Sequence, residues 1–158
     1  MIRSRALRFA VPALAALLVP ACNNNNNTIT GIPRAALTIT VDPSPVPPNQ
    51  NVLTGAVNLS YKITITEIAG LGGTVQFVSS QVFDPVSGLL VSLNYFDSND
   101  LVVFVGKKRI EPNGTLVVPQ TATYTLADLT KNATLVVNVQ MLDDHDNVIN
   151  QSVLVKVE

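Results

Sequence analysis

The sequence has few of the residues from which metal sites, disulfides and aromatic platforms are built. Its 158 residues include one cysteine, one histidine and no tryptophan. A single cysteine excludes an internal disulfide, and one cysteine with one histidine cannot make a zinc site of the Cys/His type. Charged residues are only 13% of the chain and its formal net charge is -1, which leaves no electrostatic footprint for nucleic acid. We therefore expect neither a cofactor nor a nucleic-acid partner.

What is present begins with a segment of distinct composition at residues 1–21. Three arginines among the first eight residues precede an apolar run from Phe9 to Ala21. This run of 13 residues is shorter than the ~20 residues that a membrane-spanning helix needs. A basic start, a short apolar stretch and small residues at its end predict a secretory signal peptide that is removed from the mature chain.

The only cysteine lies directly after this run, in the stretch Val19-Pro20-Ala21-Cys22. This stretch resembles the lipobox of bacterial lipoproteins, in which the signal is cleaved before the cysteine and the thiol then carries lipid. The resemblance implies a bacterial envelope protein attached to the membrane through an acyl chain such as palmitate on Cys22. The same resemblance implies, from Asn23 after the cysteine, the outer membrane or cell surface in preference to the cytoplasmic membrane. The alternative is a plain signal peptide cut near Ala21, with Cys22 left as a free thiol.

A polar stretch separates this cysteine from the rest of the chain. Residues 22–34 contain five consecutive asparagines and few apolar side chains, which is typical of a flexible tether. The sequence therefore predicts three parts. They are a signal peptide at 1–21, a lipidated cysteine with its tether at 22–34, and a folded domain at 35–158.

From residue 35 onward apolar side chains recur at every second position. The clearest alternation runs from Val57 to Ile65, and clusters of Pro, Gly, Asn and Asp separate it from similar runs. The pattern predicts seven to nine strands in an antiparallel all-β sandwich. No window has a convincing helical period, and only residues 127–133 are expected to form a helical turn. Residues 101–105 form a short, continuous apolar run.

The last third of the domain carries a family resemblance. The stretches from Gly114 to Pro119 and from Leu135 to Val157 resemble the final strands of bacterial immunoglobulin-like domains, with a Val-rich hairpin around an acidic Asn-containing turn. The resemblance implies an immunoglobulin-like sandwich across the domain, although the cysteine pair and tryptophan of antibody domains are absent. It describes the architecture and implies no activity.

The acidic turn of that hairpin is the densest cluster of oxygen ligands in the chain. Asp143, Asp144, Asp146 and Asn147 are residue types that calcium prefers. The spacing does not fit a calcium loop of the EF-hand type, and hairpin turns favour Asp and Asn for backbone reasons alone. Both interpretations stay open, a weak calcium site or a solvated turn, and we expect the turn.

Two other features also have a functional and a structural interpretation. His145, the sole histidine, lies among three aspartates in an expected turn, without a Gly-x-Ser-x-Gly motif to supply a nucleophile. Lys107, Lys108 and Arg109 form the only basic run, which could contact an anionic lipid headgroup or polysaccharide. A solvated turn or protection of a sheet edge would equally account for these three charges.

These observations predict a non-catalytic, lipid-anchored protein of the cell envelope. We expect its sandwich to act as a structural or protein-interaction module, with an unidentified envelope protein as partner. The protein is expected to be attached to the membrane through lipid on Cys22. No residue is assigned a catalytic role, and the binding residues are unknown. The alternative is a small-ligand module that binds calcium or carbohydrate through its turn loops.

Overall fold

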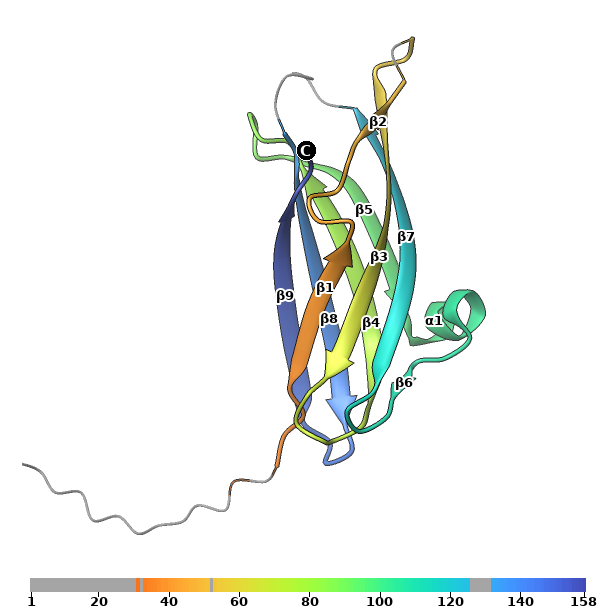
Figure 1. The fold of residues 1–158 in the computed structure, drawn as a ribbon, viewed down its shortest axis with the longest axis vertical. Helices are drawn as coiled ribbons and strands as arrows, with labels where there is room; N and C mark the ends of the chain where they lie inside the picture. Colours follow the sequence, from red (N-terminus) through yellow and green to blue (C-terminus); the bar gives the residue numbers. More distant parts are fainter. Residues whose placement is uncertain (1–30, 32, 52, 126–131) are drawn as a thin grey trace, which may run out of the picture. The chain divides into compact units, whose positions relative to one another are not determined.

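The domain is built from two antiparallel sheets that pack against each other (Figure 1). The computed structural model describes residues 31, 33–51, 53–125 and 132–158, so the predicted signal peptide and Cys22 lie outside the described residues. Residues 31–158 form one compact unit with its own hydrophobic core. Nine strands and one helix are found in the described part of the chain, which confirms the predicted all-β sandwich.

The first sheet is centred on the longest strand, which pairs with neighbours on both sides. Strand β3 pairs with β1 and β2 along one edge and with β7 along the other. The members of this sheet are β1 (Leu37–Asp42), β2 (Asn49–Gln50), β3 (Ala56–Glu67) and β7 (Thr115–Thr125). Pro119, opposite Lys62, lies on an edge strand of this sheet, as its missing N–H predicts.

The second sheet has the order β5-β4-β8-β9, with the short strand β6 also paired to β4. Its last two strands form the predicted hairpin around residues 144–147. The members are β4 (Gly73–Phe83), β5 (Leu90–Asp97), β6 (Arg109–Ile110), β8 (Thr134–Asp143) and β9 (Val148–Lys156).

The core lies between the sheets and follows from the period of two. Alternate side chains of β3, β7 and β8 point inward, and their aliphatic members are buried while the intervening residues face solvent. Fully buried members from both sheets include Leu59, Ile63, Ile65, Val75, Val78, Leu116, Leu135 and Met141. Register is strongly specified in such strands, because a shift by one residue would turn the whole apolar set to solvent.

The strand order is that of an immunoglobulin-like sandwich. Strands β1, β3 and β7 occupy the places of A, B and E, and the order β5-β4-β8-β9 matches C′, C, F and G. A parallel bridge between Val46 and Val157 also joins the segment after β1 to the end of β9. It is made by the Val46 N–H to Lys156 O bond of 3.0 Å and the Glu158 N–H to Val46 O bond of 3.1 Å.

One helix was not expected from the sequence. Helix α1 (Ser98–Val105) takes up the apolar run at 101–105. It begins at a capping box in which the Asp97 carboxylate accepts the N–H groups of Asn99 and Asp100, and it ends at Gly106 in the left-handed conformation. Two turns with a single buried side chain, Leu101, are too short to show a helical period.

Two further points concern helices. The helical turn expected at 127–133 falls largely outside the described residues. Within the described ranges, no helix has both the length and the apolar character needed to cross a membrane.

Candidate functional site

The acidic turn between β8 and β9 is organised around one buried carboxylate. Asp143 accepts backbone N–H groups from Ala35 at 3.1 Å, His145 at 2.9 Å and Asn147 at 2.9 Å. Burial alone would raise the pKa of Asp143, but these hydrogen bonds and those from the Asn147 side chain lower it from 3.8 to about 2. Asp143 therefore closes the turn and fastens the start of the domain to it.

The other candidate calcium ligands lie in the same turn, but two of them already have protein partners. Asp144 forms a two-pronged ion pair with Arg109, at 2.8 and 2.9 Å, and the Arg109 hydrogen bonds lower its pKa. The Asn147 amide donates to Asp143, and Asp146 has a φ of 61°, a conformation that aspartate tolerates. Among the described residues no group of three or more acidic, histidine or cysteine side chains is arranged to hold a metal.

His145 lies in this turn, and of the basic run Arg109 contacts it through Asp144. The His145 Nδ1 lies 3.1 Å from the carbonyl oxygen of Pro33, just before β1. Arg109 also pairs with Glu111 at 3.0 Å, whereas the Lys107 ammonium donates to the Thr115 carbonyl at 3.0 Å. The residues 33 and 34 that the sequence assigns to the tether thus contact the turn, since Arg34 donates to the Asn147 side chain at 3.3 Å.

A second buried carboxylate, Glu67, was missed in the sequence analysis. It accepts N–H groups from the segment before β1, from the β3–β4 turn and from the turn before β7. The donors are Ala36, Ala69, Gly70, Leu71 and Asn113, at 2.8 to 3.3 Å. Burial would raise the pKa of Glu67, but the hydrogen bonds from Asn113, Ala69, Ala36 and Leu71 lower it overall. The burial of Glu67 could have been predicted from the sequence, because Glu67 continues the inward-facing series of Ile63 and Ile65.

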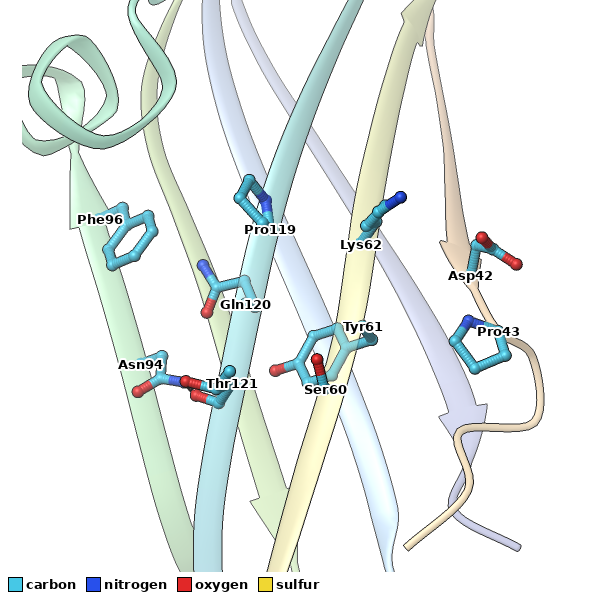
Figure 2. A pocket seen from close by; sticks show the side chains of 10 residues that line it. All are labelled: Asp42, Pro43, Ser60, Tyr61, Lys62, Asn94, Phe96, Pro119, Gln120 and Thr121. Carbon is cyan, nitrogen blue, oxygen red and sulfur yellow. Dashed lines mark hydrogen bonds between the residues drawn. The ribbon is translucent and has the colours of Figure 1, made fainter. Parts of the chain in front are cut away.

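A cleft of about 540 Å³ opens beside the edge strands β5 and β7. Figure 2 shows the Gln120 amide on the side of β7 that faces Phe96 and Asn94 of β5. Asn94 bridges the two strands by donating to the Thr121 carbonyl oxygen. The cleft therefore lies at a side of the sandwich where these two edge strands approach each other, and its lining includes the buried side chains of Tyr61 and Gln120.

A buried hydrogen-bond chain reaches this cleft from inside the sandwich. The Tyr61 hydroxyl donates to Ser80 Oγ at 2.7 Å, and Ser80 in turn donates to Gln120 Oε1 at 3.2 Å. Burial raises the pKa of Tyr61, with the hydrogen bonds of Ser80 and Asn94 opposing it. Gln120 is only 4% exposed, and its Nε2 has no hydrogen-bond partner among the described residues. Rotating the amide would only exchange an unpartnered nitrogen for an unpartnered oxygen.

The outer face of the second sheet has a different character, because it carries no charged side chain away from the strand ends. Among its four long strands the only charged residues are Asp97, Asp143 and Lys156, each the last residue of its strand. A shallow hollow of about 450 Å³ crosses this face. Its lining includes Phe77, Ser79, Gln81, Leu93, Tyr95, Asn138, Asn150 and Ser152.

This outer face combines ordered amides with exposed apolar groups. Gln140 donates to Asn150 at 3.0 Å and Ser152 donates to Asn138 at 2.7 Å, so polar side chains are tied together across β8 and β9. Phe77 and Tyr95 stack with ring centroids 5.4 Å apart. Leu93 and Tyr95 are each 53% exposed, and Leu154 is 66% exposed. Depletion of charged side chains and enrichment of aromatic ones are typical of the centre of protein interfaces.

Comparison with known proteins bears on the fold. No protein-family model matches the chain, and no curated protein sequence matches it. A Bordetella pertussis protein described as ApaA superposes with a TM-score of 0.57 at 10% identity, covering 80% of this chain and 97% of that chain. A second protein, solved by a structural genomics consortium, gives 0.55 at 14% identity, with 77% and 86% covered. At such identities the likeness shows the shared fold alone.

Proposed function

We propose that this chain is a non-catalytic lipoprotein of the bacterial cell envelope whose sandwich binds a protein partner. The observation that carries the interaction role is the outer face of the second sheet, which is uncharged away from its strand ends and exposes Leu93 and Tyr95 beside ordered amides. Such a face is depleted of the charges that disfavour the centre of an interface, while its tyrosine offers an amphipathic contact. The anchor is supported by Cys22 at the end of the apolar run.

A non-catalytic role is supported by what the polar residues do. Asp143 and Glu67 bind backbone N–H groups, Asp144 binds Arg109, and the His145 ring is turned to the Pro33 carbonyl. Each of these side chains has a role in holding the sandwich ends together. None is paired with a hydroxyl nucleophile in the described part of the chain.

The interaction role can be tested by crosslinking in cells that produce the full chain. A photoreactive amino acid at Tyr95 samples the outer face of the second sheet. One at Thr123, an exposed residue of β7 on the first sheet, serves as the matched control. We expect a discrete protein adduct from position 95 and none from position 123. Equal adducts from both positions, or none from either, would contradict this interaction face.

The anchor is tested separately by mass spectrometry of the native protein. We expect Cys22 to be the first residue and to carry acyl chains, and the Cys22→Ser variant to leave the membrane fraction. A first residue other than Cys22, or an unmodified thiol, would disprove the anchor and leave the crosslinking result unaffected.

A further inference from the structure

Helix α1 displays an apolar turn that the sandwich does not cover. Val102, Val103 and Phe104 are consecutive and exposed, Val103 at 74% and Phe104 at 64%. Single exposed apolar residues are ordinary on protein surfaces, but three in one turn of a projecting helix make a contiguous patch. In Figure 1 the helix projects from the side of the sandwich, beyond the sheets.

This apolar turn is held in place rather than loosely attached. Leu101 is fully buried, the rings of Phe96 and Phe104 stack at 5.4 Å, and the capping box closes the first turn. An ordered helix that keeps its apolar side chains in water forgoes the free energy of burying them. The exposure is therefore a stable feature of the fold, and a partner that covers these side chains would gain the free energy of burying them.

Two lysines, Lys107 and Lys108, follow the apolar turn after Val105 and Gly106. Neither Lys107, whose ammonium donates to the Thr115 carbonyl, nor Lys108 forms an ion pair among the described residues, in contrast to Arg109, which is held by Asp144 and Glu111. Apolar side chains beside uncompensated cations match the boundary of an anionic membrane, with acyl chains next to phosphate groups. A protein partner would need an acidic rim around an apolar pocket to offer the same complement.

The apolar turn lies near the end of the domain from which the predicted tether leaves. The Ala35 N–H binds Asp143, and the adjacent Asp144 binds Arg109 two residues after Lys107. Figure 1 likewise shows α1 and β6 in the half of the unit where β1 begins. Cys22 precedes Gly31 by nine residues, a reach of at most ~30 Å for extended chain. A lipid on Cys22 would keep this end of the sandwich close to the bilayer.

We propose that α1 is a second membrane contact, in which Val102, Val103 and Phe104 enter the interface of an anionic phospholipid bilayer and Lys107 and Lys108 bind its phosphates. This proposal rests on the proposed lipid anchor. Together the two contacts would fix the orientation of the sandwich and turn the outer face of the second sheet to a partner. A single lipid tether would leave that orientation free.

The test uses residues 31–158, which contain the whole core and no cysteine. An environment-sensitive dye is placed at Val103→Cys and, as a matched control, at Leu154→Cys, an exposed apolar position on β9. Phosphatidylcholine vesicles are compared with vesicles that contain one quarter phosphatidylglycerol. We expect the emission to shift to the blue at position 103 on the anionic vesicles and to stay unchanged at position 154.

Substitutions separate the apolar from the electrostatic contribution. Val103→Asp should reduce binding to anionic vesicles by ~10-fold or more, whereas Leu154→Asp should leave it unchanged. Lys107→Glu with Lys108→Glu should reduce it by at least ~25-fold, about fivefold for each lysine removed. Unchanged binding in the Val103→Asp variant, or no dye shift at position 103, would overturn the proposal.

The same variants in the full chain distinguish this proposal from the anchor. If Cys22 is acylated but the dye at position 103 stays in water on reconstituted vesicles, the α1 contact is wrong and the anchor stands. If Cys22 is unmodified while residues 31–158 still bind vesicles through Val103, the anchor is wrong and the α1 contact stands. If Val103→Asp leaves vesicle binding unchanged but removes an adduct to an envelope protein, α1 is a protein interface and the membrane proposal fails.

Discussion

Two buried carboxylates hold the end of the sandwich where the chain enters. Asp143 closes the β8–β9 turn and accepts the Ala35 N–H. Glu67 accepts N–H groups from the segment before β1, from the β3–β4 turn and from the turn before β7. Both groups are ionised in the folded state, because backbone N–H donors outweigh the cost of burial. The two charged carboxylates therefore hold neighbouring backbone segments together through hydrogen bonds.

Acid should weaken the fold through these two groups. A carboxylate whose pKa is lowered on folding stabilises the protein fully above its unfolded pKa, and this contribution disappears as the pH falls toward the folded value. For Asp143 the interval runs from 3.8 down to about 2, and the lowered pKa of Glu67 acts in the same direction. We expect the free energy of unfolding from urea titrations to fall between about pH 4 and pH 2.

The matched variants for this experiment come from the same turn. Asp143→Asn removes the anionic acceptor and should cost about 3 kcal/mol at pH 7, a difference that shrinks toward pH 2. Asp146→Asn, whose exposed side chain has no hydrogen bond in the described part of the chain, should behave as the wild type. If the free energy of unfolding varied with pH in the same way in wild type and Asp143→Asn, the stabilising role of the ionised Asp143 carboxylate would be contradicted.

Gln120 gives the opposite case, a buried polar group that is only half satisfied. Because its Nε2 has no partner, Gln120→Met removes an unpaired donor along with one hydrogen bond from Ser80. We expect the free energy of unfolding to stay within about 1 kcal/mol of the wild type, measured by urea unfolding. Tyr61→Phe, which removes a paired hydroxyl, should cost about 1 kcal/mol. A loss above about 2 kcal/mol in Gln120→Met would indicate that its Nε2 is paired in solution.

At the scale of elements, strands were easier to predict than the helix. The alternation in β3 and the hairpin of β8 and β9 were both predicted from apolar spacing and turn residues. Helix α1 was missed because five of its residues, 101–105, are consecutive apolar ones, and a run of that kind does not distinguish a helix from a strand. The usable signal was local: Asp97 and Asp100 form the capping box and Gly106 ends the helix.

Removing the cap should loosen α1 selectively. Asp97 accepts the N–H groups of Asn99 at 2.7 Å and Asp100 at 2.9 Å, so Asp97→Ala leaves both donors without their partner. We expect faster hydrogen exchange in residues 98–105 and a loss of about 1 kcal/mol in the free energy of unfolding. Ser98→Ala, next to the cap, is the control and should leave exchange in the helix unchanged. Protection retained in Asp97→Ala would mean that Leu101 alone holds the helix.

At the scale of the whole molecule, calcium should leave stability unchanged. The turn carboxylates Asp143 and Asp144 are engaged by backbone donors and by Arg109, and calcium requires 6–8 oxygen ligands. Any ligand that binds only the folded state would stabilise it, by ~2.7 kcal/mol at a concentration 100 times its dissociation constant. We expect thermal unfolding in 10 mM calcium (about 100 times a Kd of ~0.1 mM) to match that in chelator. A calcium-dependent rise that Asp144→Ala abolishes would restore the calcium-binding alternative.

The class of fold and most of the strands could be derived from the amino-acid order, because apolar alternation and turn residues act within a few positions of one another. The amino-acid order also identified Cys22 as the proposed anchor, since a signal of that kind is a linear motif. Which polar groups meet became known from the folded molecule alone: the Ala35 N–H with Asp143, Asp144 with Arg109, and Glu67 with the Asn113 N–H. These contacts join segments distant along the chain, and their pairing depends on the register and stacking of two sheets. The uncharged outer face and the exposed turn of α1 also follow from that stacking, because burial is a property of the assembled layers.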